Sequence, residues 1–113
     1  MKIITGKIKI SELKDMSARF GNMVKAVVDI GKEHIAVDAE LHSDLEALCL
    51  EQGAQQKNLW GINFYPDLEG DDFVEFDSMI NIRPSQKNMS RGVDSPETQM
   101  KIREIVAKRV EKS

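Results

Sequence analysis

The chain is poor in cysteine, because Cys49 is the only one among its 113 residues. A single cysteine excludes an internal disulfide and is typical of proteins from reducing compartments, so we expect a cytoplasmic protein. The sequence also lacks any run of the roughly 18 apolar residues that a membrane-spanning helix needs. Its N-terminus, Met1 to Lys7, has no long apolar segment of the kind that marks a signal peptide. Neither secretion nor membrane insertion is therefore expected.

An excess of positive charge is also missing. The formal net charge is −3 and the isoelectric point is near 5.4, so the long-range field that attracts nucleic acid phosphates is absent and nucleic acid binding is not expected. Hydrophobic residues make up 41% and charged residues 31%, which is ordinary for a globular protein. We expect one domain, residues 1–113, that buries its own core and folds alone or as a homodimer.

The sequence contains no recognisable spacing of a nucleophile and base, no metal-ligand cluster and no nucleotide-binding loop. We therefore predict neither a metal nor a cofactor. These residues do not identify a reaction.

Hydrophobic periodicity and turn residues predict three helices and two β-hairpins. The expected order is a helix over 11–20, a hairpin over 24–39, a helix from 43 to 52, a hairpin over 59–83 and a helix from 95 onwards. A short edge strand is also expected within the first ten residues. This α-ββ-α-ββ-α order predicts an α+β fold with a mostly antiparallel sheet of four or five strands and the helices packed on one face.

Local signals support the helix boundaries. Ser43 and Glu46 match a capping box, in which the two side chains bond to each other's backbone amides, and Gly53 suits the left-handed end of that helix. Ser95 precedes Pro96, the usual arrangement of a cap and a first-turn proline. We expect the second and third helices to begin at these two serines.

Period-two alternation along Phe73 to Arg83, combined with the other strands, predicts a polar face of the sheet. The residues expected on this face are Asp29, Asp38, Asn63, Tyr65, Glu75, Asp77, Asn81 and Arg83. Two interpretations stay open. The face is either an ordinary solvated side of an antiparallel sheet or a ligand cleft or dimer face.

The segment 81–92 follows the most strand-like run and carries Arg83, Lys87 and Arg91 without a carboxylate. Guanidinium groups fork onto carboxylates and phosphates, so this loop is the predicted place for an anionic small molecule or a protein partner. The predicted contacts are Asn81, Arg83, Gln86 and Arg91, with Asp77 orienting Arg83. The alternative is that the polar residues only satisfy backbone groups in a turn.

Two further functions are considered. In a small enzyme, His42 or Asp77 would be the general base, and Arg83 and Arg91 would stabilise charge in the transition state. This alternative requires His42 to lie near Asp77 and the loop arginines. In an interaction protein, the last helix would instead present an apolar patch. His42 in the segment 40–46 is more readily explained as a residue at a helix start than as a metal ligand, and Cys49 as a buried thiol.

Three segments carry a resemblance to known proteins. They are Glu40-Leu41-His42-Ser43-Asp44, Leu59-Trp60-Gly61-Ile62-Asn63-Phe64-Tyr65-Pro66 and Ser78-Met79-Ile80-Asn81-Ile82-Arg83-Pro84-Ser85-Gln86. With these motifs the chain resembles a family of short bacterial and archaeal proteins described as a domain of unknown function. The chain departs from that pattern at Met89, where a basic residue is usual, and near Ala39, where a glycine is usual. The resemblance implies no activity and assigns no site residue.

Overall fold

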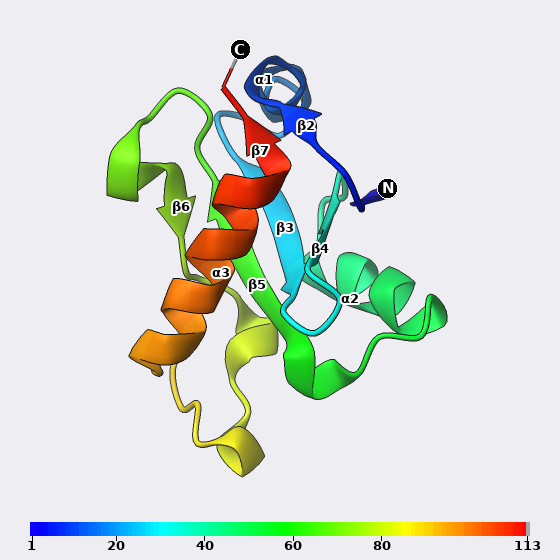
Figure 1. Ribbon diagram of the computed structural model, residues 1–113, viewed down its shortest axis with the longest axis vertical. Helices are drawn as coiled ribbons and strands as arrows, with labels where there is room; N and C mark the ends of the chain where they lie inside the picture. Colours follow the sequence, from blue (N-terminus) through cyan, green and yellow to red (C-terminus); the bar gives the residue numbers. More distant parts are fainter. Residues whose placement is uncertain (113) are drawn as a thin grey trace.

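The computed structural model describes residues 1–112, in which a five-stranded sheet is combined with three α-helices (Figure 1). The strand order is β1-β4-β3-β5-β6, and every pair of neighbours is antiparallel. A short parallel pair, β2 with β7, joins the N-terminal segment to the end of α3. The strands are β1 (Lys2–Ile4), β2 (Ile8–Lys9), β3 (Val24–Asp29), β4 (His34–Val37), β5 (Leu59–Phe64), β6 (Val74–Glu75) and β7 (Val110–Glu111). The helices are α1 (Ile10–Ser17), α2 (His42–Glu51) and α3 (Pro96–Arg109), and the short 3-10 helices are η1 (Gln56–Asn58), η2 (Gly70–Phe73), η3 (Met79–Asn81) and η4 (Pro84–Gln86).

The predicted α+β class with a mostly antiparallel sheet is confirmed, but the helices cover both faces of the sheet. Val28 packs in a cluster with residues of α1 and α3, whereas its neighbour Val27 packs in a second cluster with Leu45 and Cys49 of α2. Successive strand residues point to opposite faces, so these clusters lie on opposite sides. The unbroken apolar run Ala26 to Val28 is typical of a strand that is buried on both faces.

The larger core lies between the sheet and the pair α1 and α3. In Figure 1, α3 crosses in front of the strands and α1 lies at the end where β2 meets β7. Leu13 of α1, Ile102 and Ile105 of α3, and Phe64 of β5 are almost entirely buried. Helix α3 begins as predicted, with Ser95 Oγ accepting the Thr98 amide at 3.3 Å and Pro96 as the first helical residue.

Helix α2 begins differently from the prediction. It starts at His42, one residue before Ser43, and the residue at its N-cap is Leu41. Leucine has no side-chain oxygen, and the capping box expected for Ser43 and Glu46 is not formed, so within residues 1–112 the first turn of α2 has no side-chain cap. Gly53 does adopt the left-handed conformation after the helix, with φ of +88°.

The predicted strand over 73–83 was wrong beyond its first residues. Only Val74–Glu75 pairs with β5, and η3 and η4 follow. The reason is that the side chain of Asn81 takes the place of a neighbouring strand's backbone. Asn81 Oδ1 accepts the Gly61 amide at 2.8 Å, and Asn81 Nδ2 donates to the Gly61 carbonyl at 2.9 Å. The segment around η3 is thereby held against β5 although its backbone is not an extended strand.

The β3–β4 turn is held to α3 by Glu33. Its carboxylate contacts Lys108 at 2.9 Å and Lys101 at 3.2 Å, and its backbone carbonyl accepts from Arg109 Nε at 2.8 Å. The hydrogen bond from Lys108, followed by that from Lys101, lowers the pKa of Glu33 from 4.5 to about 2. This carboxylate therefore stays charged down to acidic pH.

We expect the contacts of Glu33 with Lys101 and Lys108 to affect how the free energy of unfolding depends on acidic pH. Because the pKa of Glu33 is lower in the folded state, its contribution is present above pH 4.5 and is lost as the pH falls toward 2. Urea unfolding measured between pH 6 and pH 2 should show that the free energy of unfolding falls less for Glu33→Gln than for the wild type. An equal loss in Glu33→Gln and in the exposed control Glu69→Gln would contradict this assignment.

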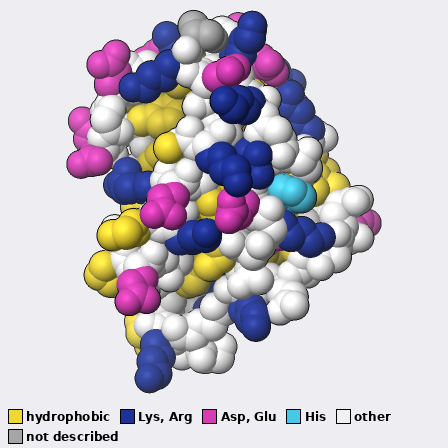
Figure 2. All heavy atoms as spheres, viewed as in Figure 1, with side chains coloured by type: hydrophobic (Ala, Val, Ile, Leu, Met, Phe, Trp, Pro, Cys, Tyr) yellow, Lys and Arg dark blue, Asp and Glu magenta, His cyan; other side chains and the backbone are white. Residues whose placement is uncertain are grey.

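Acidic and basic side chains are interspersed on the face that carries α3, as Figure 2 shows. No helix within residues 1–112 has both the length and the apolar character needed to span a bilayer.

Candidate functional site

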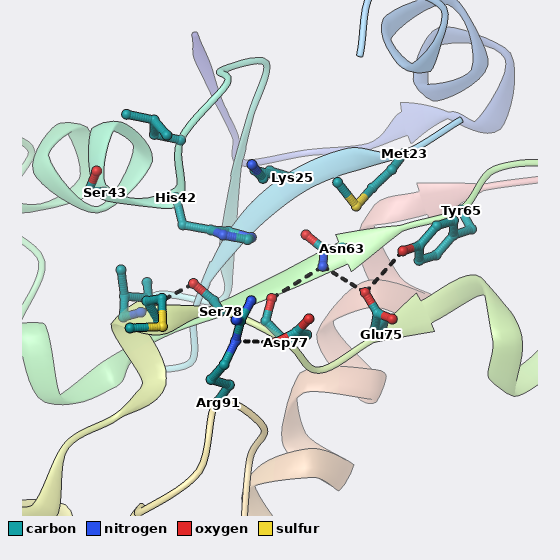
Figure 3. Close-up of a pocket in the computed structure, with 13 residues that line it drawn as sticks. Met23, Lys25, His42, Ser43, Asn63, Tyr65, Glu75, Asp77, Ser78 and Arg91 are labelled. Carbon is teal, nitrogen blue, oxygen red and sulfur yellow. Dashed lines mark hydrogen bonds and ion pairs between the residues drawn. The ribbon is translucent and has the colours of Figure 1, made fainter. Parts of the chain in front are cut away.

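A groove of about 510 Å³ opens on the face of the sheet that α2 covers only in part. Its floor is a row of cross-strand neighbours, in which Lys25 of β3 pairs with Asn63 of β5 and Asn63 pairs with Glu75 of β6. One wall is the start of α2 with His42, and the other is the segment 77–80. Figure 3 shows these side chains around the groove, with Arg91 beside Asp77. A groove of this volume is large enough for a small metabolite.

Asn63 is the central residue of the floor and is only 4% exposed. Its Nδ2 donates to Glu75 Oε1 at 2.8 Å and to the Asp77 carbonyl at 3.2 Å. Both partners are acceptors, so the orientation of the amide is fixed by its neighbours. Its Oδ1 accepts no hydrogen bond from the other described residues, although the Asn63 side chain lies close enough to His42 to act on the pKa of the imidazole. Figure 3 shows this oxygen on the side opposite Glu75 and Asp77, toward Lys25 and His42.

Acidic groups define the β6 side of the groove. Glu75 Oε1 accepts from Tyr65 Oη at 3.0 Å in addition to the Asn63 amide. Asp77 Oδ1 accepts from Arg91 Nε at 2.7 Å. Burial and then the bond to Glu75 raise the pKa of Tyr65, so its hydroxyl is a neutral donor at physiological pH.

The opposite side of the groove is basic. Lys25 Nζ donates to the Glu40 carbonyl at 2.8 Å, which places the ammonium group beside the N-terminus of α2. In the first turn of α2 the Asp44 amide already donates to the Leu41 carbonyl at 3.2 Å, which leaves the amides of His42 and Ser43, and the aligned peptide dipoles make this end electropositive. Basic and acidic groups are thus separated across Asn63.

His42 lies at the same end. Its Nε2 is 2.8 Å from the Ile62 carbonyl, which is an acceptor, so Nε2 carries the proton. Burial, followed by the charge of Lys25, lowers the pKa of His42 below its ordinary value of 6.5, although the Ile62 carbonyl and the Asn63 side chain act in the opposite direction. The imidazole is therefore neutral at pH 7, with Nδ1 as an acceptor.

We expect NMR titration of the ring protons to give a pKa below 6.5 for His42. The unfolded chain binds a proton more readily than the folded one, so the free energy of unfolding should fall as the pH decreases through and below 6.5. In His42→Gln this part of the pH dependence should be reduced. A pKa at or above 6.5 in the folded protein would show that burial does not control this side chain.

The predicted ligand residues are only partly brought together. Asp77 and Arg91 line the groove, but Asp77 orients Arg91 and not Arg83 as expected. Arg83 is used elsewhere: its guanidinium donates to the Gln56 carbonyl and, at 2.6 Å, to the Leu59 carbonyl, and it lies 4.2 Å from the centre of the Trp60 ring. The two arginines do not converge on one anion.

Gln86 and Asn81 also bind backbone groups. Gln86 Nε2 donates to the Lys57 carbonyl at 3.0 Å, next to the carbonyls that Arg83 binds. Asn81 is completely buried, and besides Gly61 it donates to the Arg91 carbonyl at 2.9 Å. These side chains position the loop against η1 and β5.

Besides Asn81 and Arg83, two further members of the expected polar face lie outside the groove. Asp29 is buried, and its Oδ1 accepts the amides of Gly31 and Lys32 in the β3–β4 turn. Asp38 pairs with Arg19 at 2.5 Å. Asn63, Tyr65, Glu75 and Asp77 do share the groove.

Lys25 is a groove residue that the sequence analysis did not predict. It is the only charged residue in the apolar run 24–28, and this signals where the sheet face opens to solvent.

Cys49 is buried in α2, and burial raises its pKa to about 11, so the thiol is unreactive at neutral pH. Across residues 1–112, no three histidine, cysteine, aspartate or glutamate side chains are placed to hold a metal ion.

The fold and this groove define a small α+β domain with a partly covered sheet face. The chain belongs to the family described as a protein of unknown function (DUF5674), whose match covers residues 2–109, so the resemblance to a domain of unknown function is confirmed. No curated protein matches the chain significantly. No solved structure matches it significantly either.

Proposed function

We propose that this protein is a binding domain and that the groove holds a small polar ligand through a hydrogen bond to Asn63 Oδ1. The observation that carries the proposal is the buried oxygen without a partner among residues 1–112. A buried acceptor that is left unsatisfied costs about 1–3 kcal/mol. An unsatisfied buried group needs a physical explanation, and a ligand that supplies the missing donor is the explanation proposed for Asn63.

The surroundings of Asn63 support a preformed site. Its amide is held by Glu75 and the Asp77 carbonyl, and Arg91 holds the Asp77 carboxylate. Side chains fixed in this way lose little conformational entropy when a ligand binds. The anionic group expected from the sequence is assigned to Lys25 and the first turn of α2, because Arg83 is occupied by backbone carbonyls.

Asn63→Leu tests the role of Asn63 in binding. Leucine has a similar shape and removes the unsatisfied oxygen, but it also removes the hydrogen bonds from Nδ2 to Glu75 and to the Asp77 carbonyl, so we expect the free energy of unfolding of the free protein to fall by about 1–3 kcal/mol. A thermal-shift screen of amino acids, nucleotides and small organic acids should find a compound that stabilises the wild type. At about 100 times its Kd the gain is about 2.7 kcal/mol, and in Asn63→Leu it should be absent.

A compound that raises the melting temperature of Asn63→Leu as much as that of the wild type would contradict the role of Asn63. A screen in which nothing stabilises the wild type would contradict the binding function itself. Asn22→Leu, at an exposed position, serves as the control for the substitution.

An enzymatic function is the second candidate, because His42, Asp77 and Arg91 line the same groove. The neutral His42 is suited to act as a general base near pH 7. Hydrolysis of p-nitrophenyl acetate or p-nitrophenyl phosphate should then depend on His42, with a rate that increases as the imidazole loses its proton. Equal rates for wild type and His42→Gln, with His34→Gln as control, would contradict this candidate.

We also propose that the protein is cytoplasmic and forms a homodimer. Light scattering coupled to size exclusion should give twice the chain mass of 12.8 kDa for a homodimer. A monomer at high concentration would contradict it.

A further inference from the structure

The two sides of the groove carry opposite charges along one row of the sheet. Lys25 and Glu75 flank Asn63 on the two neighbouring strands. Adjacent strands are about 4.8 Å apart, so the backbones of the two outer residues are separated by about 10 Å. A small ligand that lies across Asn63 therefore meets a cationic side chain at one end and an anionic one at the other.

The basic end is suited to a carboxylate. Lys25 Nζ lies beside the Glu40 carbonyl at the start of α2, and α2 has no side-chain cap in the part of the chain that the structure describes. Uncapped first-turn amides donate to anions, and the helix dipole favours negative charge at this end. Asn63 Oδ1, next to this end, is an acceptor, so it calls for an N–H donor of the same ligand and not for its carboxylate.

The acidic end is suited to an ammonium group. The Glu75 carboxylate offers acceptors for its N–H donors, and Asn63 Oδ1, which faces away from Glu75 toward Lys25 and His42, offers one more acceptor between the two ends of the groove. Arg91 already balances Asp77, and Lys25 balances Glu75, so the groove carries no net charge with His42 neutral. A ligand with only a negative charge would face Glu75, and a ligand with only a positive charge would face Lys25.

We infer that the ligand is a zwitterionic α-amino acid, with its carboxylate at Lys25 and the α2 N-terminus and its ammonium group at Asn63 and Glu75. The inference rests on the proposed function and specifies its ligand class. The apolar lining supplied by Met23, Met79 and Ile80 is suited to an apolar side chain.

The test compares amino acids with analogues that lack one charge. Isothermal titration calorimetry should show binding of at least one apolar amino acid from a panel of leucine, isoleucine, valine, methionine and phenylalanine. For leucine the matched analogues are 4-methylpentanoate, which lacks the amine, and 3-methylbutylamine, which lacks the carboxylate. Each analogue should bind at least about tenfold more weakly than its parent amino acid, because one charge-assisted interaction is lost.

Removing the charged side chain at either end of the groove should also weaken amino acid binding. Lys25→Met keeps most of the aliphatic chain and removes the charge, and Glu75→Gln removes the opposite charge. Each should weaken amino acid binding about tenfold, whereas Lys14→Met and Glu69→Gln, at exposed positions, should bind as the wild type does. Thermal melts of the variants without ligand establish that they are folded.

The outcomes separate this inference from the proposed function. If an analogue with one charge binds as tightly as its parent amino acid, or if Lys25→Met and Glu75→Gln bind normally, the ligand is not recognised as a zwitterion although the groove still binds ligands. If neither the panel nor the wider screen yields a compound whose binding depends on Asn63, the proposed function fails as well.

Discussion

Replacing Asn81 by alanine is expected to lower the free energy of unfolding by about 3–5 kcal/mol, because it leaves buried backbone groups unsatisfied. The side chain is completely buried and makes three hydrogen bonds, to the amide and carbonyl of Gly61 and to the carbonyl of Arg91. Truncation exposes none of these groups fully to water, so each retains part of its desolvation cost. Urea unfolding monitored by circular dichroism measures the change.

Asn22→Ala is the matched control, because Asn22 is exposed in the loop after α1. Its effect should stay within about 0.5 kcal/mol. If Asn81→Ala were destabilised by less than about 1 kcal/mol, the segment 78–91 would not depend on this side chain for its attachment to β5.

Replacing Gly61 by alanine is expected to cost about 2–3 kcal/mol, because the new methyl group has no space. A Cβ at position 61 would lie 2.5 Å from Ser78 Cβ and 2.6 Å from Ser78 Oγ. Relief requires the segment 77–80, one wall of the groove, to move away from β5. We therefore expect Gly61→Ala to weaken ligand binding as well as stability, although residue 61 is not among those that line the groove.

A double-mutant cycle tests the cause. Ser78→Gly removes the two nearest atoms that the new methyl group meets and leaves Ile80 Cγ1 at 3.1 Å, so Gly61→Ala should cost about 1–2 kcal/mol less in the Ser78→Gly background than in the wild type. Gly6→Ala is the control, because a Cβ at Gly6 meets nothing within 4 Å among the described atoms. Additive effects at positions 61 and 78 would show that close approach of the two segments is not the reason for glycine.

Local features could be predicted from the sequence where the determinants are close in the chain. Ser95 and Pro96 mark the start of α3 because a cap acts on amides two or three residues away. The placement of Asn63 and Tyr65 on the polar face followed from strand alternation, which is also local. The capping box at Ser43 failed because α2 begins one residue earlier, at His42.

Features that depend on distant partners could not be predicted. Arg83 binds carbonyls 24 and 27 residues earlier in the chain, and Asn81 binds a glycine 20 residues earlier. Composition identified this segment as rich in donors, but it did not show that those donors would be used by the backbone of β5 and η1. The residues that remain in the groove come from β3, α2, β5 and β6, which only the tertiary fold brings together.

The most direct test of the central claim is the side-chain amide signal of Asn63 in two-dimensional ¹H–¹⁵N spectra, recorded while a stabilising compound is added. We predict that the chemical shift of this signal changes over the same range of compound concentration as those of the backbone amides of His42 and Ser43. The backbone amide of Met100, on the exposed surface of α3, should keep its chemical shift. A bound compound that moves signals on α3 and leaves that of Asn63 unchanged would contradict the account.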